Sequence, residues 1–307
     1  MAYTSGTAAF NLDLSELVEE AFERCGSELR TGYDLRTARR SLNLLTIEWA
    51  NRGINLWTIE QGQIPLVTNQ NMYAIPNDTI DLLDHVIRTG SDTNQTDITI
   101  TRISQDTYAT IPNKNATGKP VQIWINRQSG NENATTVTLN GSILSTDTTI
   151  TVTDASQLGT TGFIRIDSEI ISYQNVSGNQ LLNCYRGQNN TTAAAHSSGA
   201  AIYVSWLSNV NIWPSPNAPG NQYTLVYWRL RRVQDTGTGA SIQDIPFRFI
   251  SCMVAGLAFY LAQKIPAAQP RIPFLKSEYE EQWALASTED RDKAADRYVP
   301  RNMMYAK

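Results

Sequence analysis

The chain has 307 residues, which is enough for one large domain or two ordinary ones. Its 25 Lys and Arg against 29 Asp and Glu give a net charge of -4, and this argues against a general nucleic-acid binder, which usually has a basic excess. Cys25, Cys184 and Cys252 form no C-x-x-C pair, so we expect buried, reduced thiols. No signal peptide is visible, and the longest apolar segment, residues 249–261, is too short to span a bilayer. These features predict no membrane contact and synthesis in a reducing cytosol.

Two amphipathic helices are predicted at the start of the chain. In the first, residues 14–25, apolar side chains recur at helical spacing, Asp13 can cap the N-terminus together with Glu16, and Gly26 ends the helix. The second is expected over residues 34–53. Each helix buries one stripe and therefore needs packing partners. The side chains expected to stay in water are Glu19, Glu20, Arg36, Arg39 and Arg40.

Short strands are predicted from residue 55 onwards, because the period of the apolar residues shifts towards two. A brief helix is expected at residues 104–110. Residues 133–204 differ in composition, since they contain no lysine and only two arginines, Arg165 and Arg186. Their Thr-, Asn- and Gly-rich runs predict an inserted β-module of ~70 residues, a size that suits a compact small domain.

A long strand with two apolar faces is predicted at residues 223–232, after a rigid corner with the sequence WPSPNAPG. The strand ends in Arg229, Arg231 and Arg232. We expect these arginines to meet acidic residues at a border between subunits; contact with nucleic acid is the alternative.

Helices return after this strand. Asp244 is expected to cap a helix that has Pro246 in its first turn and an apolar face as far as Leu261, and a fourth helix is predicted at residues 274–289. Because two helices stand at each end of the chain, we expect all four to pack into one bundle. The residues predicted to share its core are Leu17, Phe22, Leu42, Trp49, Met253, Leu257 and Trp283.

The predicted fold class is therefore α+β: a four-helix bundle from both chain ends, a central antiparallel β-platform and an inserted small all-β module. The expected segments are a helical hairpin, two parts of the platform separated by the module, the C-terminal helices and a C-terminal arm. Their predicted boundaries are, in chain order, 1–54, 55–132, 133–204 for the module, 205–243, 244–290 and 291–307 for the arm.

The sequence shows no catalytic constellation. His85 lies in a predicted strand and is expected to be an ordinary core or surface residue, while His196 lies in the loop AAAHSSG and is expected to be solvated. No nucleophile elbow, phosphate-binding loop or dinucleotide-binding loop is present. We therefore predict no enzyme, no cofactor and no metal.

Four carboxylates of the predicted module were candidates for a calcium site or an acid pair. They are Asp147, Asp154, Asp167 and Glu169. Carboxylates in such positions are more often turn caps and solvated strand ends, which is the interpretation we favour.

Several motifs follow one another in an informative order: VQIWINR, NIWPSPNAP, a Tyr/Trp strand ending in RLRRV, DIPFRFISCMVAGLAFYLAQK and EDRDKAADRYVPR. This series resembles the head-to-tail adaptor (connector) proteins of tailed bacteriophages, particularly short-tailed ones. The resemblance implies a structural virion protein that forms a twelve-membered ring beneath the portal, extends the DNA channel and seats the tail nozzle. The net acidity would suit a channel wall along which DNA must slide.

The resemblance also implies the partners. They would be the portal protein ring, a tail nozzle or tail tube protein, further copies of the chain in a dodecamer, and double-stranded DNA that passes through without sequence-specific binding. The implied location is the virion, at the head–tail junction, after synthesis in the cytoplasm of the host bacterium.

The C-terminal arm is the predicted portal-docking segment, because it is rich in Tyr, Met and Arg, which are enriched at interface cores. The candidate docking residues are Arg297, Tyr298, Val299, Pro300, Arg301, Met303, Met304 and Tyr305. A frayed tail is the alternative interpretation of this segment.

Two other functions are open on the sequence. The first is a tail-fibre or receptor-binding component whose β-module holds a glycan, for which Tyr173, Tyr185 and Tyr203 are the available aromatic residues. The second is an enzyme such as a virion hydrolase, which the lack of catalytic motifs disfavours.

Overall fold

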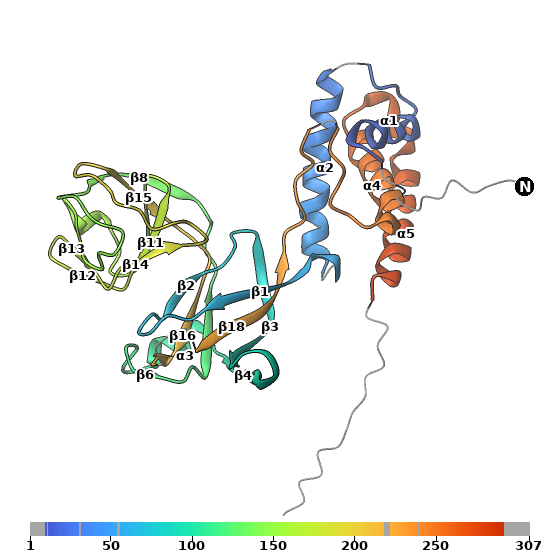
Figure 1. Cartoon of the computed structure of the whole chain (residues 1–307). Coiled ribbons are helices and arrows are strands. Elements are labelled where there is room, and N and C mark those ends of the chain that lie inside the picture. The colour runs from blue at the N-terminus through green and yellow to red at the C-terminus, as the bar shows by residue number, and fades with distance from the viewer. Residues whose placement is uncertain are drawn as a thin grey trace, which may run out of the picture. The chain divides into compact units, whose positions relative to one another are not determined.

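The computed structural model describes residues 10, 12–30, 32–53, 56–217, 222–238 and 240–291 (Figure 1). These residues form a mixed α+β fold with five α-helices and several sheets that are mostly antiparallel, which confirms the predicted class at this level. The chain divides into two compact units. The helical unit comprises the two chain ends, up to Thr58 and from Arg232, and the β unit runs without interruption from Ile59 to Arg231. The finer division into six segments stays a prediction.

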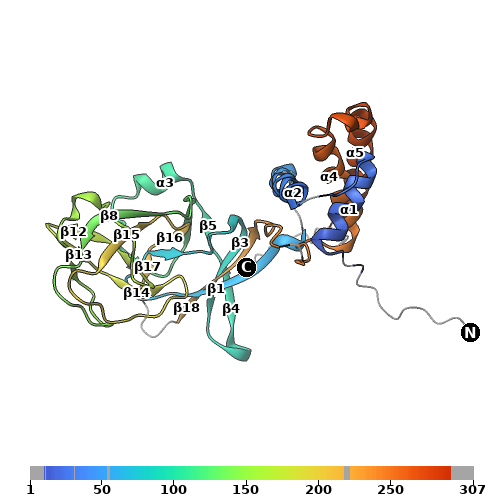
Figure 2. The same cartoon turned by 90° about the horizontal axis from the view of Figure 1, so that it is seen from above.

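Four α-helices form the helical unit. Their bounds are α1 Leu14–Cys25, α2 Gly32–Arg52, α4 Ile250–Ala262 and α5 Ile272–Glu289. Helix α4 is central, since it packs against α1, α2 and α5. Helix α2 packs mainly against α4 and has few contacts with α1 (Figures 1 and 2). Near its C-terminal end it also contacts α5, where Arg52 pairs with Glu280 at 2.9 Å.

The helices share one hydrophobic core, as the apolar spacing predicts. Six of the seven predicted core residues are buried in a single cluster, and Trp283 packs against that cluster while half-buried. The Trp49 indole N–H donates a hydrogen bond to the Tyr279 hydroxyl at 3.0 Å. The Trp49 ring also lies 5.5 Å from the Phe249 ring and 5.4 Å from the Trp283 ring. Trp49 therefore ties α2 to α5 and to the residue that precedes α4.

Helix α1 begins as predicted, whereas α4 does not. At α1, the Asp13 carboxylate accepts from the Glu16 N–H at 2.9 Å and the Glu16 carboxylate accepts from the Asp13 N–H at 3.2 Å, which completes a capping box. Asp244 does not cap α4. Pro246 is extended, a 3₁₀ turn at Phe247–Phe249 precedes the α-helix, and the Asp244 carboxylate accepts from the Gln234 N–H instead.

Two four-stranded sheets, with orders β1-β18-β3-β4 and β2-β16-β7-β5, form the first part of the β unit. The strand bounds are β1 Ile59–Pro65, β2 Met72–Ala74, β3 Thr79–Thr89, β4 Thr96–Thr99, β5 Thr101–Arg102, β7 Gln122–Asn126, β16 Asn209–Trp213 and β18 Tyr223–Arg231. In β18 the consecutive residues Leu225, Val226 and Tyr227 are all buried, so this strand is covered on both faces, as predicted. The short helix α3, Gln105–Thr110, also forms where it was expected.

The pairing in this region is not purely antiparallel, which differs from the predicted platform. β5 pairs with β7 in parallel, and so do the two-residue strands β6, Thr117–Gly118, and β17, Ser215–Pro216. β17 belongs to the proline corner, where the Trp213–Pro214 peptide bond is cis. The corner therefore has two roles: its residues pair with β6, and the chain continues from it into β18.

Residues 132–205 add a five-stranded sheet, β14-β11-β10-β15-β8, and a three-stranded sheet, β12-β13-β9. The strand bounds are β8 Glu132–Thr138, β9 Ile150–Thr151, β10 Gly162–Ile166, β11 Glu169–Tyr173, β12 Asn175–Ser177, β13 Gln180–Leu182, β14 Tyr185–Gln188 and β15 Ala201–Ser205. Their buried apolar residues form a cluster distinct from that of the two four-stranded sheets. A small third cluster, Met72, Phe163, Ile170 and Leu207, contains residues of both parts.

Candidate functional site

The cysteines do not provide a nucleophile. All three are buried free thiols, as expected from the sequence. Burial raises the pKa of Cys25 to about 11 and the pKa of both Cys184 and Cys252 to about 12. A thiol with so high a pKa is protonated near neutral pH, and the thiolate is the reactive form. Within the described ranges, no group of three or more His, Cys, Asp or Glu could hold a metal ion.

Two of the four carboxylates that were candidates for a calcium site are turn caps. Asp147 accepts from the Leu144 N–H at 2.8 Å. Asp154 precedes a 3₁₀ turn, Ala155–Gln157, and accepts from the Ser156 N–H at 2.9 Å. These bonds satisfy backbone donors that the turns leave free, so both residues have the structural role favoured from the sequence.

A buried, charged site in the β unit is centred on Glu169, the first residue of β11. Its side chain is fully buried and its two oxygens receive a bidentate contact from Arg186 at 2.8 and 2.7 Å. The backbone N–H groups of Gly187 and Ala194 donate to the same carboxylate at 2.9 and 3.0 Å. The expectation of a solvated strand end is therefore wrong for Glu169.

His196 completes this charged cluster, which corrects its predicted place in solvent. One ring nitrogen, Nε2, lies 2.8 Å from the Glu169 carboxylate, and the other, Nδ1, lies 2.8 Å from Asp167. The backbone of His196 also pairs with Ile143, which fixes the loop. His196 can donate to both carboxylates only in its doubly protonated form. We call Asp167, Glu169, Arg186 and His196 the Glu169 cluster.

The Glu169 cluster is arranged to hold structure. Burial raises the pKa of Glu169, but the hydrogen bonds from Arg186, the Ala194 N–H, His196 and the Gly187 N–H outweigh burial and lower it to about 2. A carboxylate with so low a pKa is a poor proton acceptor at neutral pH. Arg186 also donates to the carbonyl oxygens of Leu144 and Ala194, so the cluster joins three segments of the chain that are far apart in sequence.

His85 is buried in β3, one of the two outcomes expected for it. Its burial lowers its pKa, so the ring is neutral over a wider range of pH. The carboxylate of Asp84, its neighbour in the chain, accepts from the His85 backbone N–H at 2.8 Å. Both ring nitrogens are buried, and neither has a hydrogen-bond partner among the described residues. His85 is therefore a core histidine.

The three arginines predicted at a subunit border lie at the end of β18 and just after it. Arg229 contacts Asp78 at 2.5 Å and Glu60 at 2.7 Å, and Arg231 contacts Glu60 at 2.6 Å. Arg229 and Arg231 thus meet acidic residues of their own chain. Arg232 lies at an exposed position. A contact of these residues with a second subunit stays a prediction. The candidate docking arm, residues 296–307, lies outside the described residues.

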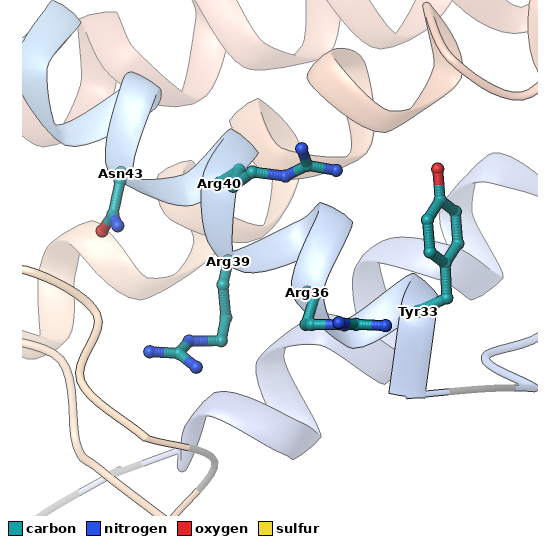
Figure 3. A pocket seen from close by; sticks show the side chains of 5 residues that line it. All are labelled: Tyr33, Arg36, Arg39, Arg40 and Asn43. Atoms are coloured by element: carbon teal, nitrogen blue, oxygen red, sulfur yellow. The ribbon is translucent and has the colours of Figure 1, made fainter.

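A basic surface on α2 is the best candidate for contact with another molecule. Tyr33, Arg36, Arg39, Arg40 and Asn43 line a hollow of about 420 Å³ on this helix (Figure 3). One turn further on, Leu44 and Ile47 are 53% and 57% exposed. We call these seven residues the α2 surface.

The arginines of the α2 surface pair with no carboxylate of the described chain. Arg40 has a single long hydrogen bond, 3.4 Å, to the Thr37 hydroxyl, and the buried Nε of Arg39 has no hydrogen-bond partner. Burial, and then the nearby charge of Arg40, lower the pKa of Lys264 on the neighbouring segment. Three arginines are therefore gathered here with no ion pair among the described residues. The expectation that these arginines lie in water is confirmed for Arg36 and Arg40, whereas Arg39 is half-buried. The exposure of Leu44 and Ile47 beside them was not predicted.

Neither a model of any known protein family nor any curated protein matches the chain. Among the described helices, none combines the length and the apolar character needed to cross a membrane.

Proposed function

We propose that the chain is a structural virion protein: a head-to-tail adaptor that forms a twelve-membered ring between the portal and the tail nozzle and extends the DNA channel. The observation that carries the proposal is the α2 surface. It combines exposed arginines without acidic partners and exposed aliphatic side chains on one helix. Arg and large apolar residues together are typical of protein–protein contacts, and their lack of partners within the chain favours a partner outside it.

The division of the chain into two compact units also supports the proposal. In this proposal the four helices form a bundle that contacts neighbouring copies and the portal. The β unit forms a stiff platform, and the sheets of residues 132–205 are a module inserted into it. Arg229 is held by Asp78 and Glu60, so the end of β18 is fixed before any assembly. A ring subunit needs such rigidity, because each copy must present the same geometry to the next.

Native mass measurement tests the proposal most directly. We expect the protein to form a closed ring of about twelve copies, either alone or when purified portal rings of the same virus are added. A protein that stays monomeric in both conditions would refute the adaptor function.

The proposed docking arm has its own test. A chain truncated after Ala295 should unfold at the same temperature as the full chain but fail to join portal rings, because the arm is expected to order on docking. The full chain is the control. Docking of the truncated chain with undiminished affinity would remove the arm from the proposal and leave the ring itself untouched.

The glycan-binding alternative has less support. Such a site needs exposed aromatic side chains near polar groups. Tyr173 is buried, and its hydroxyl donates to the Gly159 carbonyl oxygen at 2.9 Å. The Tyr203 ring is covered by the Arg165 guanidinium, which lies 4.1 Å from the ring centre.

A further inference from the structure

The helical unit has an acidic surface as well as the basic one. Four glutamates occupy the exposed side of α1: Glu16, Glu19, Glu20 and Glu23. Together with Leu12, Arg24 and the first turn and a half of α4, they line a second hollow, again of about 420 Å³. We call these four glutamates the α1 surface.

Much of the acidic charge on the α1 surface has no partner. Glu16 takes part in the capping box, and Glu20 pairs with Arg24 at 2.9 Å. Glu19 and Glu23 pair with no basic side chain in the part of the chain that the structure describes. Four carboxylates on two turns of one helix repel one another, so a cationic partner would relieve that repulsion.

The two surfaces complement each other but do not meet within one copy. The α2 surface offers three arginines and the α1 surface four glutamates, and no ion pair joins them among the described residues. Helices α1 and α2 each pack on α4 and have few contacts with each other (Figures 1 and 2). The exposed Leu44 and Ile47 have an apolar counterpart in the half-buried Leu12 and Ile250 of the acidic hollow.

We propose that the α2 surface of one copy docks on the α1 surface of the next copy. The contact uses two different surfaces, so every copy has one of each to offer, and repetition gives a closed ring or an open filament. The contact itself does not depend on the proposed function. Only the expectation that repeated contacts close into a ring rests on it. Double-stranded DNA is the other polyanion the α2 surface could meet, but the acidic α1 surface, on the same unit, disfavours it.

Charge reversal tests the contact. Arg36→Glu with Arg40→Glu makes both surfaces acidic. Glu19→Arg with Glu23→Arg removes the net negative charge of the α1 surface and places two arginines opposite the basic α2 surface. All four residues are exposed, so the variants should fold. Sedimentation at rising protein concentration in low salt should show self-association weakened roughly tenfold or more in each variant alone, as expected when like charges face each other. An equimolar mixture of the two variants should associate again, because the unchanged acidic α1 surface of the first variant then meets the unchanged basic α2 surface of the second.

A matched variant controls for net charge. Glu28→Arg with Glu281→Arg changes the charge by the same amount on the segment before α2 and on the exposed side of α5. It should associate like the unmodified protein. The proposal is overturned if this control loses association while the α1 variant keeps it, or if mixing the two opposite variants restores nothing.

Disulfide trapping decides the case if the free protein associates too weakly to sediment as an oligomer. The native thiols are buried, so Arg40→Cys in one copy and Glu19→Cys in another supply the accessible pair. Oxidation should link these two copies faster than it links Arg40→Cys to Glu281→Cys. Equal rates would overturn the proposal. It would also be overturned if Arg36→Glu with Arg40→Glu abolished binding to double-stranded DNA and left self-association unchanged.

The outcomes separate this contact from the proposed function. Twelve-membered rings that ignore the charge reversals would leave the adaptor function standing and remove the contact. Charge-dependent association into filaments, with no docking on portal rings, would keep the contact and remove the adaptor function.

Discussion

The Glu169 cluster and the α2 surface use charge in opposite ways. In the β unit, Glu169 and Arg186 are buried, and each oxygen of the carboxylate has at least two hydrogen-bond partners. In the helical unit, the core is almost wholly apolar, and Arg36, Arg39 and Arg40 of the α2 surface have no acidic partner in the described chain. Buried charge must be paired inside the fold, whereas exposed charge is free to select a partner. The difference identifies which region holds itself together and which is built to meet another molecule.

The largest expected effect tests the apolar side of the comparison. Trp49→Ala should lower the free energy of unfolding by ~3–5 kcal/mol, because it leaves a cavity in the shared helical core and deprives the Tyr279 hydroxyl of a donor. Denaturant unfolding followed by circular dichroism at a helix wavelength would measure it. Trp49→Phe is the control and should cost less, since most of the volume stays filled. Unchanged stability would show that the four helices do not depend on one core.

Glu169→Gln tests the buried charge. It should lower the stability of the β unit by about 3 kcal/mol, because Arg186, only 7% exposed, then has no anionic partner. The amide keeps the shape of the carboxylate, so the loss reports charge and not packing. The matched control, Asp167→Asn, changes a carboxylate that is 67% exposed and should have a small effect. Equal losses in the two variants would contradict a special role for burial.

The stabilisation that the Glu169 cluster provides should be lost in acid and kept at neutral pH. The folded-state pKa of Glu169, about 2, lies below its ordinary value of 4.5, so the stabilisation is complete above pH 4.5 and is lost as the pH falls towards 2. The expected loss is at most a few kcal/mol. Measuring unfolding of the protein and of Glu169→Gln between pH 6 and 3 would check it. The variant should be less sensitive to acid, and parallel curves would argue against Glu169 as the titrating group.

The smallest expected effect concerns the α2 surface. Arg36→Glu with Arg40→Glu should change the free energy of unfolding by no more than ~0.5 kcal/mol, since these side chains make no ion pair in the described chain. Thermal unfolding in moderate salt is a sufficient measurement. A large loss would mean that the arginines support the fold, and the contrast with the Glu169 cluster would then disappear.

Local signals explain what the sequence predicted well. The capping box of Asp13 and Glu16 and the helical spacing of the core residues act within a few positions of the chain, and both α1 and the shared core formed as expected. The covered strand β18 was equally clear from its two apolar faces. The start of α4 was missed, because Pro246 allows either the first turn of a helix or an extended residue before it.

Sites that depend on strand pairing were not visible in the sequence. Glu169 meets Arg186 and His196 only because β11 pairs with β14 and because the loop after β14 returns to Ile143. Nothing near His196 in the chain indicates a carboxylate partner. The exposure of Leu44 and Ile47 was missed for a related reason: which side of α2 remains uncovered depends on where α4 packs.

The division of the chain also sets an order of events during synthesis. The β unit is contiguous, so all of it has left the ribosome once Arg231 has emerged. The helical unit then has α1 and α2 but lacks α4, the helix on which both of them pack. Domains generally fold as units during translation, so the β unit can be complete while the apolar stripes of the first two helices are still uncovered. For that interval α1 and α2 are natural clients for a chaperone, and a pause in translation after β18 would prolong their exposure.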